Sequence, residues 1–424
     1  MRKFPLKLPL VLDGATGTHL FELGLKLGEC PESWILKSAD NSEAVIALQT
    51  EYYKAGSDIV LAPTFGANPF VLKRYSLDKE CEEMNKRLTA LTVEARERYY
   101  KCCGRDKKVY IAGDISPSGR FLLPYGETGF DELVSSFTRQ AIALDEAGAD
   151  LFVIETQVSL SEARAALYAV KSITEKPVFV TVTIDENGAT LSGEPSEACL
   201  ISLSSAGADA FGINCSRGAD EMLPYIKRLC ETRAEGYPLI AKPNGGLPNA
   251  SNIKQSETGE DFCCSAANLY TAGAAIVGGC CGTGPEHIAL LSKKIKSLKE
   301  TMTHSDSFKT LASNAGIIYD ISKMPLSPEI VCGIDLGDIA AEYDGCVALI
   351  RINSENDADE LVEALPFLTG PVMFISDSFI ALKRAFAVYP GRAALSGGSN
   401  ITESERERLI AEFSPAVTDG ENGI

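Results

Sequence analysis

Short apolar runs recur along the chain, each directly after a phrase that contains glycine. The phrase Ala-Gly-x-Asp, or a close variant of it, ends a helical pattern at residues 55–58, 147–150, 206–209 and 272–275, and a buried-strand pattern follows at once. Glycine at the end of a helix readily adopts the left-handed backbone that a helix cap requires. A helix joined to a strand by two residues, repeated along a chain, predicts a parallel α/β fold.

Other apolar runs complete the pattern. Together they predict eight strands, near residues 10, 60, 111, 152, 180, 211, 240 and 276. Helical periodicity predicts helices at Ser42–Ala55, Glu80–Tyr99, Asp131–Ala147, Ser161–Ile173 and Asp220–Arg233. Eight β/α units in about 300 residues are typical of a closed (β/α)8 TIM barrel, which we predict over residues 1–300. An open doubly wound sheet is the alternative, but no Gly-x-Gly-x-x-Gly turn follows the first strand and no phosphate-loop lysine is present.

The composition turns polar between residues 297 and 313, and we predict a linker over residues 301–312. Beyond it, residues 346–351, 372–375 and 392–395 have strand character, and residues 358–365 and 378–387 have helical character. We therefore predict a second, smaller α/β domain over residues 313–424.

Charge and composition exclude several classes of protein. The formal net charge of −18 argues against nucleic acid and anionic membranes as partners. No run of about 18 apolar residues predicts a membrane span, and residues 1–13 lack the apolar segment of a secretory signal. We expect a cytoplasmic protein, whose 13 cysteines are reduced thiols.

Cysteines gather where two predicted strands end, which is where a β/α barrel places its reactive groups. Cys215 follows the sixth strand, and Cys280 and Cys281 follow the eighth between glycines. A helix begins near Pro285, and thiols beside a helix amino terminus are favoured as thiolates. Three thiolates leave one position open on a tetrahedral zinc ion, as in catalytic zinc sites. We therefore predict Zn²⁺ on these three cysteines, with room for a substrate thiol, and alkyl transfer to sulfur as the reaction.

Polar residues at the other strand ends suit an amino-acid substrate. We predict that Asp13 and Glu155 hold an α-ammonium group. The backbone around Gly14 and the hydroxyls of Thr64 and Ser116 would take an α-carboxylate. Asn214, directly before Cys215, completes the predicted substrate-binding set.

Simpler interpretations of the same residues exist. The adjacent cysteines 102–103 and 263–264 lack glycine-rich surroundings, and we expect them to be core residues. A disulfide between residues 280 and 281, or 215 and 280, is the rival sulfur chemistry, but a reducing compartment disfavours it. Asp13 and Glu155 are also candidates for helix caps or for ion pairs at the barrel rim.

Four motifs resemble the zinc-dependent homocysteine S-methyltransferase family, which includes the homocysteine-binding barrel of cobalamin-dependent methionine synthase and betaine–homocysteine methyltransferase. They are Asp13-Gly-Ala-Thr-Gly17, Gly113-Asp-Ile-Ser-Pro-Ser-Gly119, Gly212-Ile-Asn-Cys215 and Gly278-Gly-Cys-Cys-Gly282, in family order over residues 1–297. Residues 242–248 and 191–193 fit the methionine-synthase branch. Asp114 departs from the family pattern, where a smaller residue is expected. The resemblance implies zinc on Cys215, Cys280 and Cys281, homocysteine as methyl acceptor and methionine as product.

The methyl donor stays open between S-methylmethionine, betaine and a methyl-corrinoid protein in trans. None of the three histidines has the Asp-x-His-x-x-Gly context of a corrinoid-binding module, so this chain has no such module of its own. Residues 370–379 and 389–396 resemble a fragment of the folate-binding (pterin) barrel of methionine synthase, and we expect a degenerate domain. Another thiol or selenol acceptor, a non-catalytic zinc-binding interaction protein and a homo-oligomer also remain open.

Overall fold

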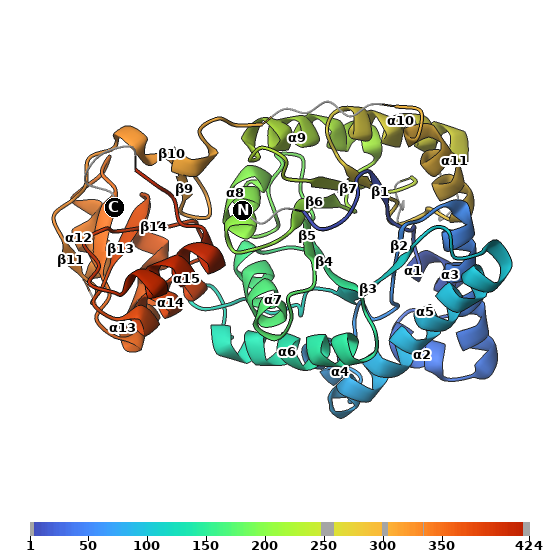
Figure 1. Ribbon diagram of the computed structural model, residues 1–424. Coiled ribbons are helices and arrows are strands. Elements are labelled where there is room, and N and C mark those ends of the chain that lie inside the picture. Colours follow the sequence, from blue (N-terminus) through green and yellow to red (C-terminus); the bar gives the residue numbers. More distant parts are fainter. Residues whose placement is uncertain (1–3, 247–257, 299–303, 334, 419–424) are drawn as a thin grey trace.

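The computed structural model describes residues 4–246, 258–298, 304–333 and 335–418. Eight parallel strands form one sheet in the order β1-β8-β7-β6-β5-β4-β3-β2, and the bridge between Leu12 and Ile59 joins its two ends. The predicted (β/α)8 barrel is therefore confirmed (Figure 1). Its strands are β1 (Leu10–Val11), β2 (Ile59–Leu61), β3 (Tyr110–Ile115), β4 (Leu151–Gln157), β5 (Val178–Val182), β6 (Ala210–Asn214), β7 (Leu239–Lys242) and β8 (Ile276–Val277).

The outer layer consists of long helices that alternate with the strands (Figure 1). They are α3 (Ala39–Ala55), α5 (Cys81–Cys103), α6 (Phe130–Glu146), α7 (Leu160–Ile173), α8 (Ser196–Ser205), α9 (Ala219–Thr232), α10 (Gly259–Thr271) and α11 (Pro285–Ile295). Shorter helices α1 (Gly17–Glu22), α2 (Pro31–Leu36), η1 (Asp78–Glu80) and α4 (Pro69–Lys73) lie in the loops after β1 and β2. The glycines of the repeated phrase, residues 56, 148, 207 and 273, all have positive φ, as helix caps require.

The interior of the barrel is packed with alternate residues of the strands, among them Leu10, Ala112, Val153, Phe179 and Ile240. This is the layered core expected of the fold, because alternate side chains of a strand point to the same face. Side chains on the other face pack against the helices. The next interior position toward the carboxyl end of each strand therefore belongs to the mouth of the barrel.

The barrel closes between β1 and β2, where two carboxylates add hydrogen bonds to the backbone bridge between Leu12 and Ile59. Asp58 Oδ2 accepts a hydrogen bond of 2.8 Å from the Val11 amide. Asp13 Oδ2 accepts one of 2.8 Å from the Leu61 amide. Side chains thus replace backbone partners where the barrel closes.

The remaining chain forms smaller sheets and helices beside α7 and α8 (Figure 1). A hairpin of β9 (Leu311–Ser313) and β10 (Ile318–Asp320) precedes a parallel sheet of β11 (Ile330–Val331), β12 (Ala348–Arg351), β13 (Val372–Ile375) and β14 (Ala394–Leu395). The helices are η2 (Phe308–Thr310), η3 (Ile321–Lys323), α12 (Leu336–Ala341), α13 (Glu355–Ala364), η4 (Leu365–Phe367), α14 (Phe379–Val388) and α15 (Glu403–Phe413).

Polar contacts connect this part to the barrel. Arg164 of α7 donates a hydrogen bond of 2.7 Å to the carbonyl of Phe386, and the Ser202 and Ser313 hydroxyls lie 2.9 Å apart. β9 begins inside the predicted linker, of which residues 301–303 lie outside the described residues. The division at residues 300 and 313, and the relation to a pterin barrel, stay predictions.

Among the helices that the structure describes, none combines the length and the apolar composition that crossing a membrane requires.

Candidate metal centre

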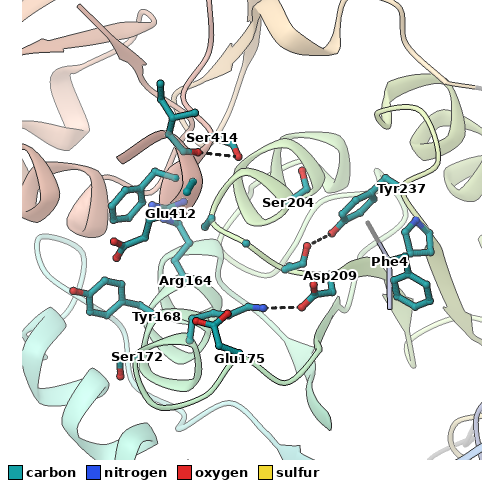
Figure 2. A pocket seen from close by; sticks show the side chains of 18 of the residues that line it. Phe4, Arg164, Tyr168, Ser172, Glu175, Ser204, Asp209, Tyr237, Glu412 and Ser414 are labelled. Atoms are coloured by element: carbon teal, nitrogen blue, oxygen red, sulfur yellow. Dashed lines mark hydrogen bonds and ion pairs between the residues drawn. The ribbon is translucent and has the colours of Figure 1, made fainter. Parts of the chain in front are cut away.

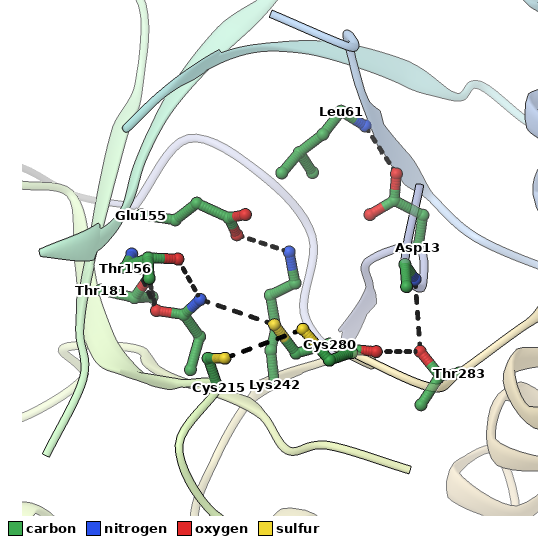
Figure 3. A network of polar contacts seen from close by, with 12 residues as sticks. Asp13, Leu61, Glu155, Thr156, Thr181, Cys215, Lys242, Cys280 and Thr283 are labelled. Carbon is green, nitrogen blue, oxygen red and sulfur yellow. Dashed lines mark hydrogen bonds and ion pairs between the residues drawn. The ribbon is translucent and has the colours of Figure 1, made fainter. Parts of the chain in front are cut away.

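Three cysteine side chains meet at the carboxyl ends of β6 and β8. The Sγ atoms of Cys215, Cys280 and Cys281 all lie within 4.8 Å of one another, and those of Cys215 and Cys281 are 3.9 Å apart (Figure 3). Zn–S bonds of about 2.3 Å in a tetrahedron place two sulfurs about 3.8 Å apart. The thiols are thus spaced as ligands of one zinc ion would be. All three are free cysteines in the structure.

Backbone hydrogen bonds hold the cysteine loops against the loop after β7. The Cys215 amide donates to the Lys242 carbonyl, and the Cys280 amide donates to the Pro243 carbonyl. Cys215 and Ser216 both have positive φ, of 57° and 55°, which is strained for residues other than glycine. Strain of this kind is found where a site fixes the direction of a side chain.

Glycine is required beside the thiols for a steric reason. A Cβ at Gly279 would lie 2.2 Å from Thr283 Oγ1, the hydroxyl that donates a hydrogen bond of 2.7 Å to the Cys280 carbonyl. The Gly-Gly-Cys-Cys sequence therefore lets the loop fold tightly enough to bring Cys280 to the other two thiols.

The side chain of Asn214, at the end of β6, is fixed by hydrogen bonds close to the thiol cluster. Its Oδ1 accepts hydrogen bonds from the Thr156 amide at 2.9 Å and the Thr181 hydroxyl at 2.8 Å. Its Nδ2 donates to Thr156 Oγ1 at 2.8 Å and lies 3.8 Å from Cys280 Sγ (Figure 3). The amide orientation is fixed because both ends have partners, and its N–H points at a thiol. An outer donor of this kind stabilises a metal-bound thiolate.

The protein environment by itself does not favour thiolates, contrary to the expectation from the nearby helix. The hydrogen bond with the Cys215 thiol, together with burial, raises the pKa of Cys280 to about 12. For Cys215 and Cys281, one thiol–thiol hydrogen bond lowers the pKa, but the other one and burial raise it to about 11. A metal cation is the partner that would remove these protons at neutral pH.

A layer of charged side chains lies beneath the thiols. Asp114, Glu155 and Lys242 each follow an interior residue of their strand by two positions, so they point into the barrel. Lys242 Nζ and Glu155 Oε2 form an ion pair of 2.6 Å, with side chains only 3% and 10% exposed. Burial alone would lower the pKa of Lys242, but the carboxylates of Glu155 and Asp13 raise it overall.

Asp13 joins this layer from the end of β1. Its Oδ2 accepts the Leu61 amide, whereas its Oδ1 is buried without a partner and faces the Lys242–Glu155 pair (Figure 3). Burial raises the pKa of Asp13 to about 7, although Lys242 lowers it. Asp114 has the same features: its Oδ1 is buried without a partner, and burial and Glu155 raise its pKa well above the ordinary range.

The predicted carboxylate-binding groups are near the mouth but already have partners. Thr64 Oγ1 donates to the Asp114 carbonyl at 2.9 Å, and Ser116 Oγ donates to the Pro117 carbonyl at 3.1 Å. Gly14 is packed so closely that a Cβ there would lie 2.7 Å from Thr283 Oγ1. Binding a carboxylate at these groups therefore requires the hydroxyls to exchange partners.

Sequence reasoning assigned no role to several residues of the site. Lys242 follows Ile240 by two positions, so strand alternation would have placed it inside the barrel. Thr156 and Thr181, which orient Asn214, carried no comparable signal. The expectation that cysteines 102–103 and 263–264 lie in the core is confirmed for Cys263, which is buried, and wrong for the other three, which are exposed. Leu247 and Pro248 of the 242–248 motif lie outside the described residues.

A large cavity of the described chain lies away from the thiols. It has a volume of about 1200 Å³ and is lined by Arg164 and Tyr168 of α7, by Asp209 and Tyr237, and by Glu412 of α15 (Figure 2). Asp209 and Tyr237 precede β6 and β7, so this cavity is at the opposite end of the barrel from the thiols. Its described lining contains no cysteine, and the chemistry of the thiol cluster is the better guide to the site.

Residues 10–295 match the family described as homocysteine S-methyltransferase. The match covers more than half of the chain, and the chain belongs to the homocysteine S-methyltransferase family. It is accordingly an enzyme that transfers a methyl group to homocysteine.

Solved structures confirm the barrel. The chain is similar to the homocysteine methyltransferase MmuM from Escherichia coli, with 23% identity and a TM-score of 0.58 for the metallated form, over 67% of this chain and 96% of that one. The oxidized form gives 24% identity and a TM-score of 0.57, over 67% and 95% of the two chains. At these identities the likeness shows the fold alone.

Proposed function

We propose that this enzyme binds one zinc ion through Cys215, Cys280 and Cys281 and methylates the sulfur of homocysteine to give methionine. The observation that carries the proposal is the spacing of the three Sγ atoms, all within 4.8 Å of one another. Three cysteine ligands leave the fourth tetrahedral position to a substrate sulfur. When bound, zinc would hold that sulfur as a thiolate at neutral pH, and the thiolate is the nucleophile.

The chain itself would orient the substrate. Asp13 and Glu155 are buried carboxylates next to the thiols and suit the α-ammonium group of homocysteine. The Thr64 and Ser116 hydroxyls and the backbone at Gly14 are the candidates for its carboxylate, after an exchange of partners. Asn214 would donate its Nδ2–H to Cys280 Sγ and so keep that ligand in place.

The transfer is a displacement at carbon. The sulfur lone pair forms the new S–CH3 bond, and the electron pair of the old bond leaves with the donor, so no oxidant or reductant is needed. S-methylmethionine, betaine and a methyl-corrinoid protein in trans are the donors to be tested. The residues of this chain contribute by alignment and by excluding water.

Metal analysis with serine variants tests the proposal. We expect one zinc per chain in the wild type and loss of zinc in Cys215→Ser, Cys280→Ser and Cys281→Ser. Cys102→Ser, which changes an exposed cysteine outside the cluster, is the matched control and should retain the metal. The zinc-loaded enzyme should then methylate homocysteine with at least one of the three donors. Unchanged zinc content in the three variants would contradict the ligand assignment.

A further inference from the structure

An exposed pair of thiols lies at the end of α5, away from the candidate metal centre. Cys102 and Cys103 are the last two residues of this helix, both are exposed, and their Sγ atoms lie 3.1 Å apart. The loop that follows them leads into β3. The metal centre lies where strands end, whereas this pair lies where a strand is about to begin, so the two groups of cysteines are at opposite ends of the barrel.

The contact between these two thiols is unusual for adjacent residues of a helix, because successive side chains point about 100° apart around the helix axis. Cys102 Sγ donates a hydrogen bond of 3.3 Å to the Tyr99 carbonyl and lies against Cys103 Sγ. The other adjacent pair in a helix, Cys263 and Cys264 of α10, has one thiol buried and the other exposed. Adjacency in the sequence alone therefore does not bring two thiols together.

The surroundings of the pair favour reaction at Cys102. The hydrogen bond with Cys102 raises the pKa of Cys103, which therefore keeps its proton and can donate it to a Cys102 thiolate. The pKa of Lys54 is raised chiefly by Glu51 and further by both cysteines, so its ammonium group lies near the two thiols. A thiolate with a cation beside it is a good nucleophile toward a disulfide.

The backbone at this end of α5 can accommodate a disulfide between neighbours. Adjacent Cα atoms are about 3.8 Å apart, whereas disulfides usually join Cα atoms about 4.4–6.8 Å apart, so the bond would be strained and the backbone would leave the helical conformation. The last carbonyls of a helix accept no intrahelical bond, and Gly104, with φ of 83°, already ends this one. The change would therefore affect only the last turn of α5.

We propose that Cys102 and Cys103 form a site of reversible oxidation, at which a low-molecular-weight disulfide such as oxidised glutathione converts the two thiols to one disulfide. The Cys102 thiolate attacks one sulfur of the external disulfide, and the first glutathione thiolate leaves. Cys103 then attacks Cys102 Sγ and displaces the second glutathione. The protein gives up two electrons and two protons, and the external disulfide becomes two thiols.

The strain predicts that this disulfide is easily reduced again. Strained and exposed disulfides have more oxidising potentials than structural ones, and disulfides in reducing compartments are usually transient. Excess reduced glutathione should therefore restore both thiols. The proposal goes beyond the proposed function, since the modified residues contribute nothing to the predicted zinc site.

Peptide mass measurement tests the proposal on the zinc-loaded enzyme. Trypsin cleaves after Lys101 and Arg105, so residues 102–105 form a peptide with these two cysteines and no other. After incubation with mixtures of oxidised and reduced glutathione and blocking of free thiols, we expect this peptide to lose the mass of two hydrogen atoms. Its oxidised fraction should change from about one tenth to about nine tenths over about a 100-fold change in [GSH]²/[GSSG], as a two-electron exchange requires.

A peptide that stays reduced at the highest proportion of oxidised glutathione, or that carries glutathione instead of an internal disulfide, would overturn the proposal. In Cys103→Ser we expect Cys102 to hold one glutathione, because the second thiol is missing. The readout does not depend on metal binding, so failure of the proposed function would leave it interpretable.

The matched control is the pair Cys263 and Cys264 within the same protein. It has the same adjacency, but it lies in the middle of α10 with one thiol buried, and we expect no disulfide between its members. Equal oxidation of the two pairs would show that adjacency alone is sufficient and would overturn the structural argument. The zinc content should be the same before and after oxidation of Cys102 and Cys103.

Discussion

Replacing Lys242 by methionine should destabilise the barrel in a way that depends on pH. The change keeps most of the side-chain length and removes the cation of a pair with an N–O distance of 2.6 Å. At this distance the attraction is about 6 kcal/mol for an effective dielectric constant of 20. Breaking a buried pair by removing one partner typically costs about 3–5 kcal/mol, since the other charge stays buried.

Protonation limits this cost. A carboxylate that stays buried without its cation escapes the penalty by taking up a proton, which for an ordinary glutamate costs about 4 kcal/mol at pH 7 and about 1.4 kcal/mol less for each pH unit below that. The folded variant then binds a proton that the unfolded chain does not. Lys242→Met should therefore lower the free energy of unfolding by about 3–4 kcal/mol at pH 7, and this difference should become smaller as the pH falls toward 5.

Trp34, the single tryptophan, lies in α2 and reports on the barrel through its fluorescence. Urea unfolding of metal-free wild type and variant at pH 5.5, 6.5 and 7.5 measures the difference. Lys171→Met is the matched control, because Lys171 pairs with Asp209 at 2.7 Å with side chains 20% and 13% exposed. Its cost should be smaller, about 1 kcal/mol, and independent of pH in this range. A Lys242→Met cost that does not change with pH would refute the reasoning and point to lost packing.

Three further predictions concern the metal centre. Asn214→Ala should lower the free energy of unfolding by about 2–3 kcal/mol, because it leaves Thr156 and Thr181 without their partners. It should also weaken zinc binding by about 10-fold to 100-fold. Competition with a chelator measures the zinc affinity, and Asn187→Ala, at an exposed position, is the control. Zinc affinity should rise steeply with pH between 6.5 and 7.5, by up to about 1000-fold, if all three thiols with raised pKa lose a proton on binding. An affinity that changes little with pH in the same assay would contradict the assignment of the three thiols as ligands. Gly279→Ala should destabilise the protein by about 1–3 kcal/mol and lower its zinc content, because the new Cβ clashes with Thr283. The control is Gly129→Ala, whose new Cβ has no atom within 4 Å and which should retain zinc.

The sequence allowed the barrel to be predicted because its signals are local. A glycine cap followed by an apolar run specifies where one helix ends and the next strand begins, and all eight predicted strands are present. Outside the barrel the signals were weaker. The hairpin of β9 and β10 and the two-residue strand β11 are too short to show periodicity. Helix α15 was missed although Thr402 and Glu405 form a capping box at its start.

For the candidate site, the sequence allowed us to predict which residue types take part and at which strand ends they lie. Cys215, Cys280 and Cys281 stand at the ends of strands, and the fold alone brings such positions together. Which groups pair inside the mouth depends on side-chain distances between distant strands. For this reason the Lys242–Glu155 pair was not predicted, and neither was the protonation of the thiols, which follows from burial and from contact among the three.

The closure of the barrel has a consequence for ligand binding. Asp13 uses one carboxylate oxygen to hold β2 against β1, and its other oxygen is free at the mouth. An ammonium ion attracted to the free oxygen also stabilises the charged form of the carboxylate and hence strengthens its bond to the Leu61 amide. Binding of an amino acid at the mouth should therefore slow hydrogen–deuterium exchange at the Leu61 amide, because the contact between β1 and β2 becomes stronger.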